Sequence, residues 1–454
     1  MTVAVAPRVS IARNGILWAT VLGSSVSFID TTAVNVALPA IGRDLDAGLS
    51  GLQWTIDSYV FTLASLMVVS GALGDRFGRR RVFVIGLVAF AAASALCAMA
   101  WSIESLIIAR ALQGVAGSLM IPNSLAVLRA SFPQSEQGRM IGAWTAWSGI
   151  TTVAAPFLGG WLVDTWSWRL IFAINLPLLA AAAYLALRCV PAFPARADAP
   201  PLDWPAIPAV IVAFGGITYG LIERDWLLAG IGLLALPVLI WREQRARDPL
   251  IPLELFSIRN FSFGNASTVA VYAALGGSTF VLTLLLQNIA GYSALQTGAA
   301  SAPISICMVI LAARFGGLAG KYGPRWFMAG GPLLIAVALA WLSRLDGDPA
   351  YVQDILGPMI VFGIGLSVVV APLTAAVIGA APESHAGVAS AINTAMARLG
   401  TTLAVAAVGL AAQDGFTEAA YGSAMLMCAA LALGGAVIAA AGIRTVPATA
   451  EAGG

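Results

Sequence analysis

Two charged residues stand inside long apolar stretches of this sequence: an acid that can bind a proton, and an arginine whose charge would change how readily a nearby acid does so. Asp30 lies in SSVSFIDTTAVNVALP (residues 24–39), and Arg110 lies in LIIARALQGVAG (residues 106–117). A charge among apolar residues is costly and usually serves a function. Removal from water favours the neutral form of a carboxyl group, whereas a neighbouring arginine favours the charged form. If Asp30 meets Arg110 in one conformation only, it can take up and release a proton.

Simpler roles for both residues stay open. Asp30 would then only hydrogen-bond the polar residues that follow it in its own helix, and Arg110 would extend from a helix end toward the membrane surface. Asp57 lies near the outer end of the second apolar stretch, and we expect it to face water. Further polar residues in the apolar stretches are candidates for a substrate path, although such groups also hold helices together: Tyr59, Asn175, Gln287, Asn393 and Arg398.

A stretch rich in glycine and arginine, GALGDRFGRRRV (residues 71–82), follows the second apolar run. Its first two glycines allow a close helix approach, and its acid, in a short loop, can pair with an arginine or with amides at a helix N-terminus. The third glycine supplies a tight turn. An ordinary positively charged loop is the alternative. The candidate gating residues are Gly71, Gly74, Asp75, Arg76, Gly78, Arg79 and Arg80.

Small residues and a proline mark a third stretch, SGITTVAAPFLGGWLVD (residues 148–164). Gly149, Pro156, Gly159 and Gly160 predict a kinked helix with a smooth face, against which another helix packs tightly or slides. A generic membrane helix rich in glycine and proline is the alternative.

These stretches resemble signatures of the major facilitator superfamily. Residues 71–82 match its gating loop, residues 106–117 its fourth helix, whose arginine is implicated in proton transfer, and residues 148–164 its antiporter helix, with Ala155 where glycine is usual. The fourteen-span drug:proton antiporter branch is similar in four further stretches: FIDTTAVNVALPAI (28–41), WRLIFAINLP (168–177), LQNIAGYSALQTG (286–298) and GVASAINTAMARLG (387–400). The resemblance covers roughly residues 15–441. It implies that Asp30 couples transport to protons and that Asp75 and its neighbours latch the cytoplasmic side shut.

Membrane spans are the elements that must position these residues. The chain has 454 residues, of which 59% are hydrophobic and only 10% are charged, with a mean hydropathy of +0.88. A span needs about 20 apolar residues. Such runs predict fourteen spans, at 15–38, 52–73, 82–101, 104–128, 140–163, 170–188, 205–222, 226–241, 261–289, 297–319, 327–343, 353–380, 386–412 and 421–441.

The predicted fold is an all-α polytopic membrane protein. It has a six-helix bundle at 15–188, linkers at 189–260 that enclose a hairpin at about 205–241, and a second six-helix bundle at 261–441. Two matched halves around a central site are common in secondary transporters, and the resemblance implies the major facilitator fold.

The basic residues predict the orientation. Cytoplasmic loops carry most Lys and Arg. With the N-terminus inside, only Arg43, Arg169, Arg224 and Arg344 of the 24 basic residues fall outside, and Arg110 and Arg398 lie within spans. An even number of spans with both termini cytoplasmic preserves this segregation, in the plasma (inner) membrane.

Residues for other chemistry are scarce. The four cysteines are far apart, and His385 is the single histidine, so we expect no metal site and no disulfide framework. Motifs for metalloprotease, nucleophile-elbow or Walker-type chemistry are missing, which argues against a membrane enzyme and against direct use of ATP.

We therefore expect a proton-coupled exporter of lipophilic drugs or small metabolites that works by rocker-switch alternating access. The alternative within transport is an importer or uniporter of a metabolite or lipid without proton antiport. The expected partners are a small lipophilic substrate and the lipid bilayer, with no nucleic acid and no cofactor beyond the proton gradient. The resemblance implies a monomer.

Overall fold

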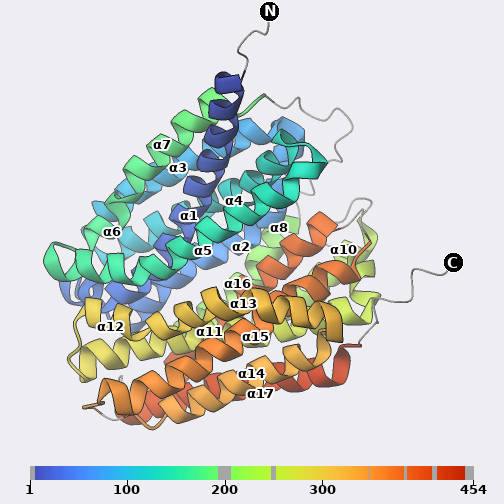
Figure 1. Cartoon of the computed structure of the whole chain (residues 1–454). Helices are drawn as coiled ribbons and strands as arrows, with labels where there is room; N and C mark the ends of the chain where they lie inside the picture. Colours follow the sequence, from blue (N-terminus) through green and yellow to red (C-terminus); the bar gives the residue numbers. More distant parts are fainter. Residues whose placement is uncertain are drawn as a thin grey trace, which may run out of the picture. The chain divides into compact units, whose positions relative to one another are not determined.

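Helices make up nearly all of the computed structural model, which describes residues 6–192, 206–246, 252–345, 347–382, 386–411 and 417–444 (Figure 1). His385 and much of the predicted linkers lie outside these ranges. The α-helices are α1 (Ala6–Asp44), α2 (Leu49–Phe77), α3 (Arg79–Ala98), α4 (Ile103–Ser131), α5 (Gln134–Thr165), α6 (Arg169–Ala173), α7 (Asn175–Cys189), α8 (Ala206–Val210), α9 (Gly216–Ile222), α10 (Trp226–Arg245), α11 (Arg259–Leu284), α12 (Ala294–Ala300), α13 (Ala302–Tyr322), α14 (Arg325–Leu342), α15 (Leu356–Ala380), α16 (Ala386–Ala411) and α17 (Glu418–Gly442).

Short π-helical and 3-10 turns interrupt or extend these helices. They are η1 (Ile211–Gly215), η2 (Leu253–Ser257), η3 (Leu285–Ile289) and η4 (Tyr351–Ile355). Helix is the expected state of such apolar segments, because lipid offers no partner for backbone N–H and C=O groups. Eleven helices of the described chain are long and apolar enough to cross a membrane, and the shorter apolar helix Pro208–Ile222 adds to them.

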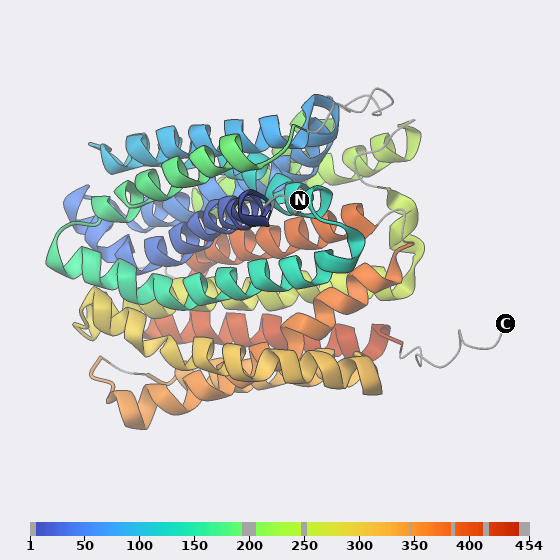
Figure 2. The same ribbon diagram turned by 45° about the horizontal axis from the view of Figure 1, so that its top comes forward.

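The chain divides into two compact units. The first contains Met1–Ala47 and Trp54–Asp203, and the second contains Gly48–Gln53 and Trp204–Gly454. Inside the first unit, α1 packs along α5 and α7, and α3 packs along α4. Inside the second, α11 packs along α16 and α17, and α14 along α15 and α17 (Figure 2). The hairpin formed by α8, η1, α9 and α10 belongs to the second unit.

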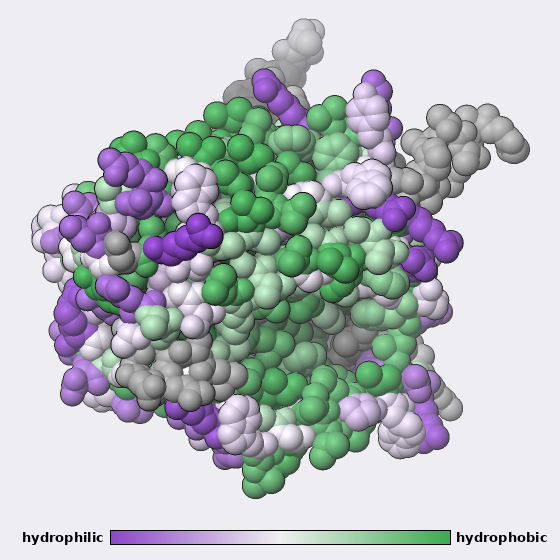
Figure 3. Space-filling model, turned by 90° about the horizontal axis from the view of Figure 1, so that it is seen from below, coloured by the Kyte–Doolittle hydropathy of each residue, from purple (hydrophilic) through white to green (hydrophobic). Residues whose placement is uncertain are grey.

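Apolar side chains cover outward faces of the second unit, as a lipid environment requires. Figure 3 shows a broad hydrophobic area on one such face. Exposed apolar residues on α14 and α17 include Leu333, Val337, Trp341, Leu433 and Val437.

The expected loop at residues 74–81 is reduced to one residue. α2 continues through Asp75 and ends at Phe77, and α3 begins at Arg79. Gly78 alone joins them, with φ 93° and ψ 122°. This left-handed region favours glycine, because a Cβ atom would be strained there. Asp75 therefore lies on the last turn of a helix and not in a loop.

Candidate functional site

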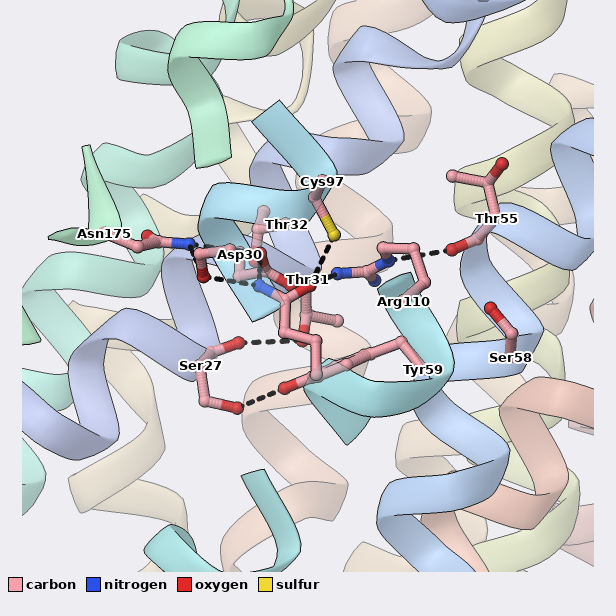
Figure 4. Close-up of polar contacts among 12 residues, drawn as sticks. Ser27, Asp30, Thr31, Thr32, Thr55, Ser58, Tyr59, Cys97, Arg110 and Asn175 are labelled. Atoms are coloured by element: carbon pink, nitrogen blue, oxygen red, sulfur yellow. Dashed lines mark hydrogen bonds and ion pairs between the residues drawn. The ribbon is translucent and has the colours of Figure 1, made fainter. Parts of the chain in front are cut away.

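A buried ion pair lies inside the first unit. Arg110 on α4 donates from Nη1 to Oδ2 of Asp30 on α1, at 2.5 Å. Asp30 is 0% exposed and Arg110 is 1% exposed. Figure 4 shows the two side chains directed toward each other from different helices. Because both charges are out of water, the pair is stable only if further hydrogen bonds satisfy its remaining polar atoms.

Amide side chains supply these bonds. Gln113 donates from Nε2 to Asp30 Oδ1 at 2.8 Å, and its Oε1 accepts from Arg110 Nη1 at 2.7 Å. Asn175 on α7 donates to Asp30 Oδ1 at 3.3 Å. Both amides also donate to Ser94 Oγ, at 3.0 and 3.4 Å. We call these five residues the ion-pair cluster. Three side chains thus donate to one carboxylate.

Arg110 also has uncharged partners. Its Nε donates to the backbone carbonyl of Thr55 at 2.9 Å, and its guanidinium carbon lies 4.3 Å from the centroid of the Tyr59 ring. The Tyr59 hydroxyl shares a hydrogen bond of 2.5 Å with Ser27 Oγ (Figure 4). A cation over an aromatic face gains about 0.5–2 kcal/mol. These contacts of Arg110 do not involve Asp30.

The simpler roles for the two charged residues do not match this geometry. Thr31, Thr32 and Asn35 each donate to a backbone carbonyl one turn earlier, and not to the carboxylate of Asp30. The buried position of Arg110 rules out an extension to the membrane surface. The Asp30 carboxylate on α1 instead accepts hydrogen bonds from Arg110 and Gln113 on α4 and from Asn175 on α7. This carboxylate therefore joins three helices.

Asp57 was expected to face water, and this expectation is wrong. Its side chain is 0% exposed, and neither carboxylate oxygen has a hydrogen-bond partner in the structure as described. The sequence is misleading here because α2 begins at Leu49, so Asp57 lies about two turns inside the helix. Burial of an ionised carboxyl group without a donor costs several kcal/mol. Asp57 is therefore a second buried acid, in surroundings unlike those of Asp30.

The small residues of the expected antiporter helix lie on α5. Pro156, Gly159 and Gly160 are buried, whereas the surroundings of Gly149 are outside the described residues. A Cβ atom on Gly159 would lie 2.8 Å from Cβ and 3.0 Å from Cα of Ala33 on α1. Since real Cβ contacts are not that short, glycine lets α5 pack directly against the segment of α1 that carries the ion pair.

We expect Gly159→Val to lower the free energy of unfolding by about 1–3 kcal/mol, because overpacking forces α1 and α5 apart. The displaced segment includes Asp30, so substrate transport should fall as well. Thermal unfolding in detergent and a vesicle transport assay measure the two effects. Gly142→Val on the same helix is the matched control, because a Cβ atom at Gly142 meets no atom within 4 Å. Equal behaviour of the two variants would contradict this prediction.

The expected gating residues divide into a packed and an open group. Gly74 is buried against the side chain of Asn123 on α4, and a Cβ atom would collide with its amide oxygen. A Cβ atom on Gly71 would meet nothing within 4 Å. The close approach of a neighbouring helix therefore requires glycine at position 74 but not at position 71. The Asp75 side chain lies outside the described part of the chain.

The arginines around Gly78 connect neighbouring helices of the first unit. Arg79 donates to the carbonyl oxygen of Ala126 on α4 at 3.5 Å, and Arg80 donates to that of Leu187 on α7 at 2.6 Å. Arg76 is exposed on the last turn of α2, with its guanidinium group over the neighbouring ring of Phe77. The start of α3 is therefore fixed to both α4 and α7.

Three candidates for the substrate path lie in the second unit. Asn393 on α16 donates to Asn265 Oδ1 at 3.2 Å and to Thr268 Oγ1 at 2.8 Å, both on α11. This arrangement joins two helices. Gln287 in η3 is 9% exposed, and Arg398 on α16 is half-buried. None of the three belongs to the ion-pair cluster.

Other candidates for the substrate path, Tyr59 and Asn175, lie at the ion pair. Gln113, Ser94 and Cys97 also lie there but were not among the predicted site residues; Cys97 Sγ is 3.6 Å from Gln113 Oε1. Their spacing along the helices is the sequence feature that could have identified these residues. Residues 94 and 97, and residues 110 and 113, are polar or small side chains three positions apart in apolar helices, so each pair shares a face.

No group of three or more metal-binding side chains occurs among the described residues.

Comparison with known proteins shows the family. The sequence matches the family described as Major Facilitator Superfamily over residues 20–405 and 264–452. It is 33% identical over 408 residues to the tetracenomycin C resistance and export protein of Streptomyces glaucescens, covering 87% of this chain and 75% of that protein. The methylenomycin A resistance protein of Streptomyces coelicolor is 32% identical over 399 residues, covering 86% and 83%. The multidrug resistance protein Stp of Mycobacterium tuberculosis is 34% identical over 404 residues, covering 87% and 74%.

Solved structures share the fold at low sequence identity. A crystal structure of an auto-inhibited POT family peptide transporter has a TM-score of 0.72 at 18% identity, covering 96% of this chain and 98% of the other. A bacterial homologue of the human lysosomal transporter Spinster, in an inward-facing and unoccupied conformation, has a TM-score of 0.69 at 16% identity, covering 95% and 96%. These likenesses establish the transporter fold and not the substrate.

Proposed function

Because this chain belongs to the major facilitator superfamily, we propose that it exports lipophilic drugs or small metabolites in exchange for protons. The buried pair of Asp30 and Arg110 is the observation that carries this proposal. A carboxyl group inside the membrane that has a charged partner in one conformation can change its protonation state when that partner moves. The names of the relatives, which are resistance, export and multidrug resistance proteins, support export as the direction.

The exchange would run on the ionisation of Asp30. In the described conformation Arg110, Gln113 and Asn175 all donate to its carboxylate. This conformation would be the proton-free one. A rearrangement inside the first unit during the rocker-switch cycle, which separates α1 from α4 or α7, would remove donors, and the desolvated carboxyl group would then take up a proton. Arg110 would stay at Thr55 and Tyr59 during this step. Proton release, as the donors return, would accompany the binding of substrate on the cytoplasmic side.

The architecture we propose has fourteen spans. The eleven apolar helices of the described chain, the shorter helix Pro208–Ile222, and α2 and α5 together give this number. The hairpin at about 205–241 would separate two six-helix bundles, with both termini in the cytoplasm and the monomer as the working form. Residues 71–80, which surround the single-residue turn at Gly78, would act as the cytoplasmic latch.

Reconstituted vesicles test the coupling. With an imposed pH gradient, we expect uptake of a lipophilic dye or an aromatic antibiotic to proceed against its own gradient, and we expect added substrate to release protons that a pH-sensitive dye reports. The physical reason is that one buried carboxyl group serves both processes in turn. Collapse of the gradient with an ionophore should abolish accumulation.

The competing function is an importer or uniporter of a metabolite or lipid. Its signature would be transport that equilibrates substrate and does not respond to the pH gradient. Liposomes without protein are the control for passive leakage of lipophilic compounds. Gradient-independent transport of every compound in a panel would reject proton antiport and leave the family assignment intact.

A further inference from the structure

An apolar groove runs along the hairpin of the second unit. It has a volume of about 440 Å³ and is lined by Pro208, Ala209, Val212, Ile231, Leu234, Ala235 and Val238. Leu234 is 71% exposed, Val238 is 58% exposed and Val212 is 47% exposed. One wall comes from α8 and η1 and the other from α10, and these elements pack against each other within this unit (Figure 1 labels α8 and α10). The groove therefore opens outward from the hairpin.

Close packing at the other end of the hairpin explains why the groove forms where it does. A Cβ atom on Gly232 would lie 2.6 Å from the backbone of Ala213 and Ile217, and one on Gly220 would lie 2.5 Å from Cβ of Ala229. Small residues thus bring the two arms into backbone contact there. The groove lies beyond this contact, where Pro208 and Ala209 on α8 and Val212 in η1 face Leu234, Ala235 and Val238 on α10.

The groove leads to a charged and aromatic end of α10. Val238, Trp241, Arg242 and Arg245 follow at helical spacing, so they continue the face that Leu234 begins. The Arg245 guanidinium carbon lies 4.2 Å from the centroid of the Trp241 ring, and both side chains are exposed. Tryptophan and arginine at a helix end are typical of the membrane interface.

Two acidic residues lie at this end of the sequence, Glu243 and Asp248, and Asp248 lies outside the described residues. Glu243 is 3% exposed and accepts from Arg242 Nη1 at 3.2 Å. The buried carboxylate offsets the charge of Arg242 and leaves Arg245 as the exposed cation. The sequence places Arg247 two residues further along, outside the described residues. Over residues 241–249 three arginines stand against two acids, so the net charge is positive.

We propose that the hairpin binds one anionic phospholipid, with an acyl chain in the groove and the phosphate against Arg245. The combination fits a lipid better than another ligand, because the apolar groove and the basic group lie on one continuous helix face. Basic sites between membrane helices bind anionic head groups, and each basic side chain near such a surface contributes roughly a fivefold gain in affinity. The site shares no residue with the ion-pair cluster, and the proposal does not depend on transport.

Native mass spectrometry of the purified full chain tests this proposal. Phosphatidylglycerol and phosphatidylcholine with identical acyl chains are titrated separately, and the occupancy of the first bound lipid is compared. We expect the wild type to bind phosphatidylglycerol about fivefold more tightly. Arg245→Gln should remove most of this preference, since it removes the exposed charge. Ala235→Phe, which fills the groove, should weaken both lipids.

Arg188→Gln is the matched control. Arg188 at the end of α7 also stands over an aromatic ring, that of Tyr184 at 5.6 Å. Because Arg188 is not part of the hairpin, the Arg188→Gln variant should keep the lipid preference of the wild type. Because Arg245 is exposed, its variant tests the site even if Ala235→Phe does not fold. Equal binding of the two lipids by the wild type would overturn the proposal. So would a dimer that Ala235→Phe dissociates, because a second copy of the chain would then occupy the groove.

Discussion

Asp30→Asn is expected to abolish transport driven by the pH gradient, with accumulation of substrate falling by at least about tenfold. Asparagine has nearly the same shape and can still accept a hydrogen bond from Gln113, but it cannot ionise. The variant therefore removes the proton-binding step and leaves most contacts of the cluster in place. The measurement is substrate accumulation in vesicles across a series of imposed pH gradients, normalised to folded protein.

Asp44→Asn is the control for this experiment. Asp44 lies at the end of the same helix and also pairs with an arginine, Arg169 at 2.5 Å, but the two side chains are 46% and 36% exposed. An exposed pair of this kind contributes about 0–1 kcal/mol. Asp44→Asn should therefore keep the gradient dependence of the wild type. If Asp30→Asn also kept it, Asp30 would not be the coupling group.

Arg110→Met is expected to have the largest effect on stability. It leaves the Asp30 carboxylate buried without its charged partner, and breaking a buried pair from one side costs about 3–5 kcal/mol. The variant also loses the contact with the Tyr59 ring and the bond to the Thr55 carbonyl. Unfolding of the purified protein in detergent, by heat or by denaturant, measures the loss. Arg169→Met, which breaks the exposed pair, should cost at most about 1 kcal/mol.

A double-mutant cycle separates the ion pair from packing. Combined with Arg110→Met, Asp30→Asn removes the buried charge that the single variant leaves without a partner. The double variant should therefore be more stable than Arg110→Met alone, with an interaction free energy of roughly 1–3 kcal/mol. Additive losses would show that the two charges do not stabilise each other and would contradict the pair as the organising contact.

The helices could be predicted from sequence because lipid imposes a simple rule. A run of about 20 apolar residues has to be a helix in a membrane, whatever its detailed sequence. The predicted run at 226–241 corresponds to α10 at Trp226–Arg245, and the run at 421–441 corresponds to α17 at Glu418–Gly442. The residues at which the helices begin and end were harder to predict. Helix α2 extends to Phe77 because only Gly78 needs a non-helical φ, and no hydropathy signal marks such a turn.

The candidate site could be predicted only in part. Asp30 and Arg110 were visible as isolated charges in apolar runs, but their contact spans 80 positions and depends on how α1 and α4 pack. Gln113 was harder to recognise, because an uncharged amide in a membrane helix is commonly a packing residue. The sequence also gave no reason to place Asp57 in the interior. Exposure near a helix end depends on neighbouring helices, which hydropathy along one chain does not report.

The charge balance of the ion-pair cluster has an electrical consequence. With Asp30 ionised, its negative charge cancels that of Arg110 and the cluster is neutral; with Asp30 protonated, the cluster carries one positive charge. Under the proposed exchange, export of an uncharged cargo for one proton would therefore move one elementary charge across the bilayer. A membrane voltage contributes about 2.3 kcal/mol per charge for each 100 mV. Export would then draw on the electrical as well as the chemical part of the proton-motive force.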